Sequence, residues 1–358
     1  MNIAIVIGTR PEIIKMAPLI RILTNRNIPY VLIHSNQHYS SNMDEIFFQD
    51  LQLPQPTYNL GIGSADHGNQ TGRMLMEIEK ILLKERPDIV LCQGDTNTVL
   101  AGILAASKQD ILTGHVEAGL RSYDRRMPEE KNRIICDVLS DFLFAPTSVQ
   151  KGILEGEGIP SEKIYVVGNT IVDAVYQHKE LAENQSKILS TLDVKEKEYV
   201  LLTAHRSLNV DTYDALEHLV NLVNQIKDIT GLDVIYPIHP RTRVKLDQYG
   251  LEIINARLID PLGYLDFLTL EMHAGLIVTD SGGIQEEACI LNIPCITIRE
   301  NTERPETVTV GANKLSGLDI QRFKDAYEYH KNNQNKWENP FGDGHTAERI
   351  VEIITSKS

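Results

Sequence analysis

Two hydrophobic patterns alternate along the whole chain: short, almost wholly apolar runs, and longer stretches in which apolar residues recur every three or four positions. The short runs predict strands and the longer stretches predict amphipathic helices. The predicted strands are 2–7, 30–34, 88–93, 111–116, 141–144, 163–167, 199–204, 233–238, 252–255, 275–279 and 294–298. The predicted helices include 11–23, 71–84, 96–107, 129–139, 213–227, 264–272, 283–291 and 319–329. Apolar strands separated by helices indicate parallel sheets covered on both faces.

The alternation continues through both halves of the chain, and each half is long enough for a doubly wound α/β domain of about 170 residues. We therefore expect two domains, residues 1–168 and residues 169–343. A C-terminal helix within 344–358 is free to pack back on the first domain. Doubly wound sheets bind ligands beyond the carboxyl ends of their strands, so the active site is expected in the cleft between the domains.

The charge balance narrows the range of partners. The 358 residues include 35 Lys+Arg and 49 Asp+Glu, which gives a formal net charge of −14. Duplex DNA and membrane surfaces need an extended basic face, so neither nucleic acid nor membrane is an expected partner. No apolar run approaches the ~18 residues of a membrane span, and the first residues lack the basic leader of a signal peptide. We expect a cytoplasmic enzyme or ligand-binding protein, and the four cysteines lack metal-binding spacing.

The turn after the first predicted strand has the composition of an anion-binding site. Gly8 ends the strand, and Pro11 suits the first turn of a helix. Arg10 and Lys15 stand near the N-terminus of that helix, whose free N–H groups favour an anion. A plain surface turn with an extended lysine explains the same residues without a ligand. The position after the first strand of a doubly wound sheet favours the anion site.

A second such turn lies within 279–287, TDSGGIQEE, between an apolar strand and a helix. Gly282 and Gly283 let a phosphate approach the backbone, Ser281 adds a hydroxyl group, and the helix dipole adds positive potential. Glu287, one turn into the helix, is placed to accept both hydroxyl groups of a ribose. Ser281 is also explained as a helix cap alone. Capping and phosphate binding are compatible, and the strand–turn–helix context favours the phosphate site.

Carboxylates follow the predicted strands of the first half. Asp95 comes after LCQG and Glu117 after TGHV, so both are expected at the carboxyl edge of the sheet. Glu129 opens a helix four residues before Arg133, which by itself indicates a surface ion pair worth under ~0.5 kcal/mol. Together with the other two acids, Glu129 instead suggests a group of carboxylates placed for proton transfer.

Histidine and arginine follow strands of the second half. His205 and Arg206 follow its first predicted strand, His239 its second, and Arg299 and Arg304 its last. A lone histidine is more often structural, but a His-Arg pair facing an anion site is a candidate acid or electrostatic group. Cations gathered at strand ends of an acidic chain indicate a local site for a doubly charged ligand.

Several well-known motifs do not occur in the sequence. No G-x-G-x-x-G follows a strand, and there is no P-loop, His-Glu-x-x-His or Gly-x-Ser-x-Gly. These observations disfavour a tightly bound nicotinamide, a P-loop nucleotide, catalytic zinc and a serine hydrolase. No cofactor and no metal are therefore expected.

Nine short segments, most of them at predicted strand ends, carry a resemblance that runs through nearly the whole chain. They are GTRPEIIK (8–15), QGDT (93–96), GHVEAGLR (114–121), PEEKNR (128–133), FAPT (144–147), GNTIVD (168–173), AHR (204–206), TDSGGIQEEA (279–288) and TERPE (302–306). In this order they resemble the non-hydrolysing UDP-N-acetylglucosamine 2-epimerase family. The resemblance implies two Rossmann-like domains of the glycosyltransferase-B type, interconversion of UDP-GlcNAc and UDP-ManNAc, and a cytoplasmic homodimer.

The resemblance also implies roles for single residues. The implied catalytic residues are Asp95, Glu117, Glu129 and His205. The implied substrate contacts are Arg10, Lys15, Arg133, Ser281, Gly282, Gly283, Glu287 and Arg304. In some relatives a second UDP-GlcNAc acts as an activator at the positions of Gln37, Arg206 and His239. The chain departs from the family pattern at 207–209, where SLN replaces a usually acidic stretch, and in the short loop 122–127.

The implied reaction suits these residue types. The C2 hydrogen of the sugar is not next to a carbonyl group, so direct deprotonation is too costly. Loss of UDP from C1 together with the anti proton at C2 gives a 2-acetamidoglucal, and re-addition from the other face inverts C2. This chemistry needs a carboxylate base, an acid on the opposite face and a cationic site for the departing diphosphate. The product would serve the synthesis of cell-surface polysaccharide precursors.

Other functions stay open at this point. An epimerase of a different UDP-N-acetylhexosamine would need the same residues. A glycosyltransferase would share the phosphate site, but it needs an acceptor pocket and has no use for three carboxylates from one domain. A UDP-sugar sensor without activity would not need intact acids. A hydrolysing relative is disfavoured by the Arg10-Pro11-Glu12 turn, which resembles the non-hydrolysing branch.

Overall fold

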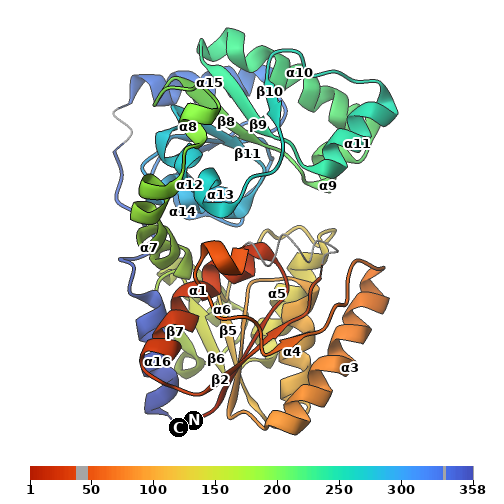
Figure 1. The fold of residues 1–358 in the computed structure, drawn as a ribbon, viewed down its shortest axis with the longest axis vertical. Helices are drawn as coiled ribbons and strands as arrows, with labels where there is room; N and C mark the ends of the chain where they lie inside the picture. Colours follow the sequence, from red (N-terminus) through yellow and green to blue (C-terminus); the bar gives the residue numbers. More distant parts are fainter. Residues whose placement is uncertain (38–46, 334–335, 358) are drawn as a thin grey trace. The chain divides into compact units, whose positions relative to one another are not determined.

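The computed structural model describes residues 1–37, 47–333 and 336–357 and divides the chain into two compact units (Figure 1). Unit 1 consists of Met1–Gln177 and Phe341–Ser358, and unit 2 consists of His178–Pro340. The division falls inside α7 (Thr170–Gln185) rather than near residue 168. The sequence marks the end of the last strand of unit 1, but the first two turns of the following helix still belong to that unit.

Unit 1 is built on a parallel sheet with the strand order β3-β2-β1-β4-β5-β6-β7. Its strands are β1 (Ile3–Ile7), β2 (Tyr30–His34), β3 (Tyr58–Asn59), β4 (Ile89–Gln93), β5 (Leu112–Val116), β6 (Phe142–Ala145) and β7 (Ile164–Val166). Its other helices are α1 (Arg10–Asn25), α3 (His67–Glu85), α4 (Asn97–Ser107), α5 (Pro128–Leu139), α6 (Ser148–Gly156), the 3-10 helix η1 (Ser161–Lys163) and α16 (Thr346–Ser356). Apolar side chains of α3 and α4 cover one face of the sheet, and α6 packs on the same face, against β6 and β7.

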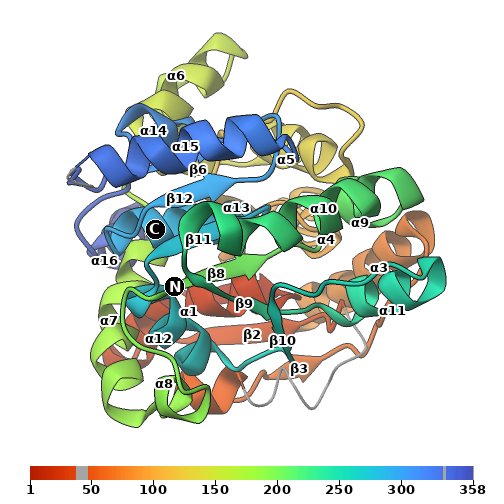
Figure 2. The ribbon, with the colours of Figure 1, turned by 90° about the horizontal axis from the view of Figure 1, so that it is seen from above.

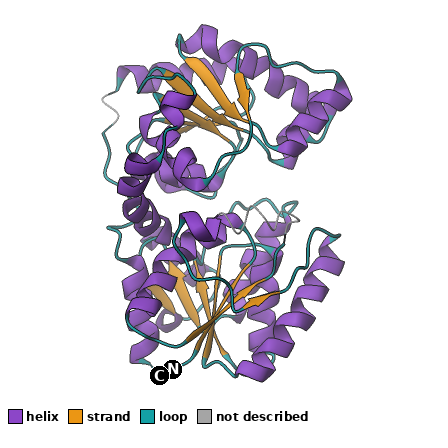
Figure 3. Cartoon of the chain, in the orientation of Figure 1, coloured by secondary structure: helices purple, strands orange, loops and turns teal. Residues whose placement is uncertain are grey.

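Unit 2 repeats this architecture with the strand order β10-β9-β8-β11-β12-β13. Its strands are β8 (Tyr199–Thr203), β9 (Asp233–Pro237), β10 (Arg257–Ile259), β11 (Leu276–Thr279), β12 (Cys295–Thr297) and β13 (Asn313–Leu315). Its helices are α8 (Ile188–Thr191), α9 (Ser207–Val210), α10 (Tyr213–Thr230), α11 (Pro240–Tyr249), α12 (Tyr264–His273), α13 (Gly282–Ile290), α14 (Pro305–Thr309) and α15 (Ile320–Asn332). In both units helices flank the strands on both sides (Figure 3). Both are therefore α/β units with doubly wound parallel sheets, as the sequence predicts.

Residues of β8 alternate between two apolar clusters, because successive side chains of a strand point to opposite faces. Val200 and Leu202 belong to the cluster under α10 and α15, which lie side by side on one face of the sheet (Figure 2). Tyr199 and Leu201 belong to the cluster under α8 and α12. A strand buried on both faces explains why β8 reads as a continuous apolar run.

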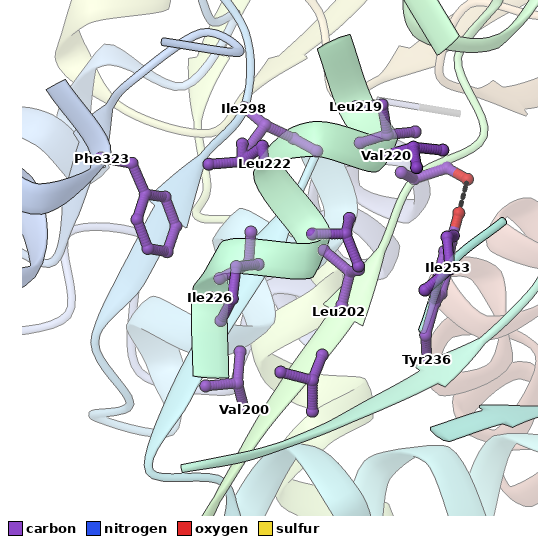
Figure 4. Close-up of a cluster of buried hydrophobic side chains, with 14 of the residues drawn as sticks. Val200, Leu202, Leu219, Val220, Leu222, Ile226, Tyr236, Ile253, Ile298 and Phe323 are labelled. Atoms are coloured by element: carbon purple, nitrogen blue, oxygen red, sulfur yellow. Dashed lines mark hydrogen bonds between the residues drawn. The ribbon is translucent and has the colours of Figure 1, made fainter. Parts of the chain in front are cut away.

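Helix α10 shows how the sequence pattern produces this packing. Leu219, Leu222 and Ile226 recur at helical spacing and lie on one side of the helix, toward the sheet (Figure 4). Thr212 caps its N-terminus by accepting a hydrogen bond from a backbone N–H, and Gly231 ends it in the left-handed conformation with φ 73°. The helix is therefore specified at both ends and along its buried side.

The structure departs from the sequence pattern at short edge segments. The predicted strand 252–255 is wrong, because the edge strand is β10, which follows it. The side chain of Asn224, on α10, accepts the backbone N–H groups of Ile254 and Asn255 and donates to the carbonyl of Glu252. This stretch therefore satisfies its backbone through a helix side chain instead of a strand. The strands β3 and β13 are too short and too polar for the sequence pattern to reveal.

Helix α16 returns the end of the chain to unit 1, where it packs against α1. Its N-terminus is fixed by Asp173 of α7, whose carboxylate accepts the backbone N–H groups of Thr346 at 3.2 Å and Ala347 at 2.9 Å. A carboxylate is favourable there because the first N–H groups of a helix have no partner within the helix.

Two features are missing from the part of the chain that the structure describes. No helix there combines the length and the apolar character that crossing a membrane requires. No group of three or more His, Cys, Asp and Glu side chains there is arranged to hold a metal ion.

One buried carboxyl group of unit 2 has no hydrogen-bond partner among the described residues. Glu271, on α12, is fully buried, and neither of its carboxyl oxygens has a hydrogen-bond partner among the described residues. Burial raises the pKa of Glu271 well above its usual value, and the charge of Glu287 raises it further. Glu271 therefore keeps its proton in the folded protein at pH values where the unfolded chain has released it.

We predict that Glu271→Met stabilises the protein by about 1–3 kcal/mol near neutral pH, because an apolar side chain replaces a buried polar group without partners. The folded state binds more protons at Glu271 than the unfolded state does, so this residue lowers stability progressively as pH rises above its unfolded pKa. The gain should therefore grow with pH. Denaturant unfolding of both proteins at about pH 5 and about pH 8 measures it, and an equal or absent gain at the two pH values would contradict the assignment.

Candidate functional site

The strand order gives each unit a topological switch point, where the chain leaves two neighbouring strands in opposite directions. It lies between β1 and β4 in unit 1 and between β8 and β11 in unit 2. Doubly wound sheets bind ligands outside the carboxyl ends of such strands. Gly8 directly follows β1 and Asp95 comes soon after β4, while His205 and Asp280 occupy the matching positions of unit 2. The clusters identified in the sequence thus lie at both switch points.

Glu117 forms a buried ion pair with Lys15. The Lys15 Nζ atom, on α1, lies 2.8 and 2.9 Å from the two carboxylate oxygens of Glu117. The two side chains are only 6% and 3% exposed. Gln93, the last residue of β4, donates a further hydrogen bond to the same carboxylate. Glu117 has a φ of 70°, which residues other than glycine rarely adopt, so the turn after β5 holds this carboxylate in a constrained position.

Arg133, on α5, joins two acids. Its guanidinium donates to Asp95 and to Glu130, whose Oε2 lies 2.6 and 3.0 Å from two of its nitrogens. The suggested pair of Arg133 with Glu129 does not form, and half-buried Glu129 has no polar partner within the described residues. Residues three and four apart share a helix face, and buried Glu130 is the one that compensates buried Arg133. Although burial acts to raise it, hydrogen bonds from Ser122 and Arg133 hold the pKa of Glu130 below its usual value.

Glu12 organises the turn after β1, although the sequence analysis gave it no role. Its Oε2 atom accepts the backbone N–H groups of Gly8 at 2.5 Å and Thr9 at 3.3 Å. Burial raises the pKa of Glu12 to about 7, while these hydrogen bonds act in the opposite direction. The signal in the sequence is the capping box, Thr9 followed three residues later by Glu12. In the same turn, the Arg10 guanidinium lies 5.3 Å from the centre of the Phe47 ring.

Asp280 fixes the turn that carries His205. The fully buried carboxylate accepts the backbone N–H groups of His205 at 3.0 Å and Arg206 at 2.9 Å, and the side-chain N–H of Asn209 at 3.0 Å. Its Oδ1 atom also lies 3.3 Å from Nδ1 of His205. A proton on Nδ1 is therefore favoured, which leaves Nε2 on the accessible side of a ring that is 45% exposed. The ring of His239 lies 6.1 Å away.

The N-terminus of α13 lies against an arginine. A Cβ atom on Gly282 would come within 3.3 Å of the Arg304 Cζ atom, so the guanidinium covers the first turn of the helix. A Cβ atom on Gly283 would meet only the Ser281 hydroxyl, at 4.0 Å. Ser281 makes no capping hydrogen bond, and Glu287 lies farther along α13, buried. Free N–H groups, a hydroxyl group and a guanidinium are the donors that an anion requires.

Three arginines converge on Glu303 beside this helix. Arg299 contacts both carboxylate oxygens, at 2.8 and 2.9 Å, while Arg206 lies 3.6 Å and Arg304 3.9 Å away. Arg304 also binds Glu286 at 2.9 Å. Although burial acts to raise it, the arginines hold the pKa of Glu303 well below its usual range. Three guanidinium groups thus lie against two carboxylates, Glu303 and Glu286, beside α13.

The residues that the resemblance assigns to an activator belong to both units. In unit 1, Gln37 accepts hydrogen bonds from the hydroxyl group of Thr98 at 2.9 Å and from its backbone N–H at 3.3 Å. In unit 2, Arg206 follows β8, and His239 caps α11 by accepting the backbone N–H of Arg241 at 3.2 Å. Each residue is thus fixed at a strand end or a helix N-terminus of its own unit.

The chain is similar along almost its whole length to UDP-N-acetylglucosamine 2-epimerases and related 2-epimerases. A family model described as UDP-N-acetylglucosamine 2-epimerase matches residues 21–355. A Methanococcus maripaludis protein of that name is 55% identical over 362 residues, 99% of this chain and 98% of its own. A Pseudomonas aeruginosa UDP-2,3-diacetamido-2,3-dideoxy-D-glucuronate 2-epimerase is 43% identical over 88% of each chain. The crystal structure of Methanocaldococcus jannaschii UDP-GlcNAc 2-epimerase in complex with UDP-GlcNAc and UDP matches with a TM-score of 0.95 and 53% identity, covering 99% of this chain and 100% of its own.

We predict that Lys15→Met lowers the free energy of unfolding by about 3–5 kcal/mol, because Glu117 would stay buried without its cation. Arg26→Met is the matched control, since Arg26 pairs with Glu348 across side chains that are 40% and 43% exposed. The control should change stability by less than about 1 kcal/mol. Denaturant unfolding measures the stability of both variants. Similar decreases in the free energy of unfolding would show that the buried Lys15–Glu117 pair contributes no more than an exposed ion pair.

Proposed function

The chain belongs to the UDP-N-acetylglucosamine 2-epimerase family, and from this membership we propose that it inverts C2 of UDP-N-acetylglucosamine to give UDP-N-acetylmannosamine. Its fold is the two-unit, Rossmann-like fold of the glycosyltransferase-B type that solved members of the family share. The observation that carries the proposal is the match, at a TM-score of 0.95 and 53% identity, to an epimerase solved with UDP-GlcNAc and UDP.

The proposed reaction is an elimination followed by an addition. A base removes the C2 proton while the C1–O bond breaks on the opposite face, so UDP leaves and a C1–C2 double bond forms. The intermediate is a 2-acetamidoglucal. An acid then returns a proton to the other face of C2, and UDP adds back to C1. No net oxidation occurs, and the sequence, which lacks a dinucleotide-binding motif, is consistent with such a reaction.

Asp95, Glu117 and Glu129 supply the base and the acid in this proposal, and His205 assists. The support is that the turns after the neighbouring strands β4 and β5 hold Asp95 and Glu117 at the carboxyl edge of the sheet, each in contact with one cation. The Asp95 side chain is 30% exposed, so its carboxylate is open to a ligand. Arg133, which the resemblance counts as a substrate contact, also fixes the direction of this carboxylate.

The UDP moiety occupies the N-terminus of α13 in this proposal. Ser281, Gly282 and Gly283 contact the diphosphate, Arg304 neutralises it, and Glu287 accepts the ribose hydroxyl groups. The guanidinium groups of Arg299 and Arg304 beside α13 support this assignment, because the departing UDP carries developing negative charge. Arg10 and Lys15 are substrate contacts in this proposal, as the resemblance implies.

We further propose a cytoplasmic homodimer that a second UDP-GlcNAc activates through Gln37, Arg206 and His239, with the product used for cell-surface polysaccharide precursors. Exposed apolar side chains on α5 and α3, the two helices that flank α4, support the dimer. Ile135 and Val138 of α5 are 41% and 62% exposed, and Met76 and Leu83 of α3 are 55% and 50% exposed. Such side chains are more common at subunit interfaces than on free surfaces.

A second candidate substrate is favoured by one comparison. The Pseudomonas aeruginosa relative, at 43% identity, is named for a diacetamido glucuronate sugar. The short loop 122–127 immediately precedes α5, which carries Glu129. Residues of this loop are placed to distinguish substituents on the sugar ring, so the alternative is a 2-epimerase of another UDP-N-acetylhexosamine.

Proton NMR in D2O with UDP-GlcNAc tests the proposed function. We expect the C2 proton signal to disappear through solvent exchange while signals of UDP-ManNAc appear. The UDP-diacetamido glucuronate sugar, assayed in parallel, identifies the preferred substrate. A glycosyltransferase or a sensor would bind the nucleotide sugar without exchange, and that result would refute the epimerase assignment.

Glu117→Gln should abolish exchange but retain UDP binding, because it removes the charge and keeps the shape of the side chain.

We predict that Ser281→Ala weakens UDP binding by roughly 10- to 100-fold, since a hydrogen bond to a charged phosphate is lost. Stability should hardly change, because the hydroxyl group makes no capping hydrogen bond. Thr212→Ala is the matched control. It removes a real helix cap at α10, so it should cost about 1 kcal/mol of stability and leave UDP affinity unchanged. Calorimetric titration with UDP measures both, and an unaltered affinity in the Ser281 variant would exclude the phosphate contact.

A further inference from the structure

We propose that His115 and Asp137 form a positioning pair, with His115 held as an imidazolium, that fixes the two turns carrying Asp95 and Glu117. This inference rests on the proposed function, because the two turns matter as the supports of the reacting carboxylates. Neither His115 nor Asp137 was a candidate site residue in the sequence analysis. Both are almost completely buried, so they act through the backbone and do not touch the substrate.

The contacts of the His115 ring require both of its nitrogens to donate. Nδ1 lies 2.6 Å from Oδ1 of Asp137, and Nε2 lies 2.7 Å from the carbonyl oxygen of Gly94. A carbonyl oxygen only accepts, and the Asp137 carboxylate already accepts the backbone N–H of Gly119 at 3.2 Å. A neutral imidazole has one N–H and would leave one of these two acceptors without a donor. Two protons on the ring satisfy both.

The two acceptors belong to the two turns of the proposed site. Gly94 directly precedes Asp95, and Gly119 comes two residues after Glu117. Both glycines have left-handed φ angles, 88° and 83°, which glycine adopts readily, but glycine also has the greatest conformational freedom, so hydrogen bonds from the pair restrict the two turns. His115 holds the first turn through the Gly94 carbonyl, and Asp137 holds the second through the Gly119 N–H. The pair therefore sets the position of one carboxylate relative to the other.

Helix α5 ties this pair to the side chain of Asp95. Asp137 stands four residues after Arg133, so both face the same side of the helix. Arg133 binds the Asp95 carboxylate, and Asp137 binds His115, whose other nitrogen binds the residue before Asp95. The backbone and the side chain of this acid are thus fixed from one helix.

The charged surroundings suit a buried cation at His115. The charged groups that face the ring are Asp137 of α5 and, beyond it, Arg121, which lies 2.7 Å from the Asp137 Oδ2. Glu157, at the end of α6, binds Arg121 in turn at 2.6 Å. The positive charges of His115 and Arg121 therefore balance the negative charges of Asp137 and Glu157. Burial acts to lower the pKa of His115, but Asp137 and the Gly94 carbonyl raise it above its usual value.

The expected consequence is kinetic. Loss of the pair lets the two turns shift, and small displacements of reacting groups lower the rate of the chemical step by up to roughly 100-fold. The nucleotide contacts belong to other elements, so KM and UDP affinity should stay within about twofold of wild type. As pH rises through the pKa of His115, the second N–H is lost, so kcat should fall on the alkaline side.

The experiment compares His115→Gln with His330→Gln. His330 is a matched control because it is also buried, on α15, with Nε2 3.0 Å from the carbonyl oxygen of Cys295. We expect His115→Gln to lower kcat by roughly 10- to 100-fold, to retain KM and to lose the alkaline fall in kcat. His330→Gln should retain the wild-type kcat, even if this variant is less stable than the wild-type protein. An unchanged kcat and pH profile in folded His115→Gln would overturn the proposal.

Nitrogen NMR of the wild-type protein with labelled histidine gives a readout independent of activity. Both ring nitrogens of His115 should carry protons at neutral pH, with the signals assigned in the wild-type spectrum from through-space correlations to neighbouring residues. A neutral His115 ring would overturn the proposal even if the variant does not fold. If wild-type protein exchanges no C2 proton with any UDP-N-acetylhexosamine, the proposed function fails, and the NMR result still decides whether His115 is the imidazolium that the two turns require.

Discussion

A carboxylate removed from water needs a cation or several hydrogen-bond donors beside it, and this requirement organises both units. Glu117 is compensated by Lys15, which comes from the first helix of unit 1. Asp280 is compensated by backbone N–H groups of the turn after β8. In each case the compensating group lies far away in the sequence, so the buried carboxylate is stabilised only after the sheet has formed. Glu271 has no such partner among the residues that the structure describes and stays protonated instead.

The fold class followed from the sequence because doubly covered parallel strands have a strong local signature. Every residue of β1 and β8 is buried, and both strands read as unbroken apolar runs. The signature fails at the sheet edges, where strands are short and half-exposed. At 252–255 the apolar pattern was misleading, because Asn224 of a distant helix takes the backbone hydrogen bonds that a neighbouring strand would have made.

The positions of the candidate residues at the strand ends were predictable, but their hydrogen-bond and ion-pair partners were not. Topology alone places groups that follow parallel strands at one edge of the sheet, and the polar clusters do lie there. Pairing depends on contacts between distant segments. Helical periodicity allows Arg133 to meet residue 129 or residue 130, and the choice of Glu130 reflects its burial and its bonds to the loop before α5. Likewise, nothing local indicates that Lys15 faces Glu117, 102 residues away.

The two units differ in how their charges are balanced, and this difference bears on the proposed reaction. In unit 1 the acids lie beside their own cations, so Asp95 and Glu117 present little net charge to an approaching diphosphate. In unit 2 the guanidinium groups of Arg206, Arg299 and Arg304 are held in place beside α13 by Glu303 and Glu286. A leaving group that gains negative charge is stabilised most by cations that are already fixed in place. Separate compensation in each unit therefore allows a chain of net charge −14 to bind and release an anionic substrate.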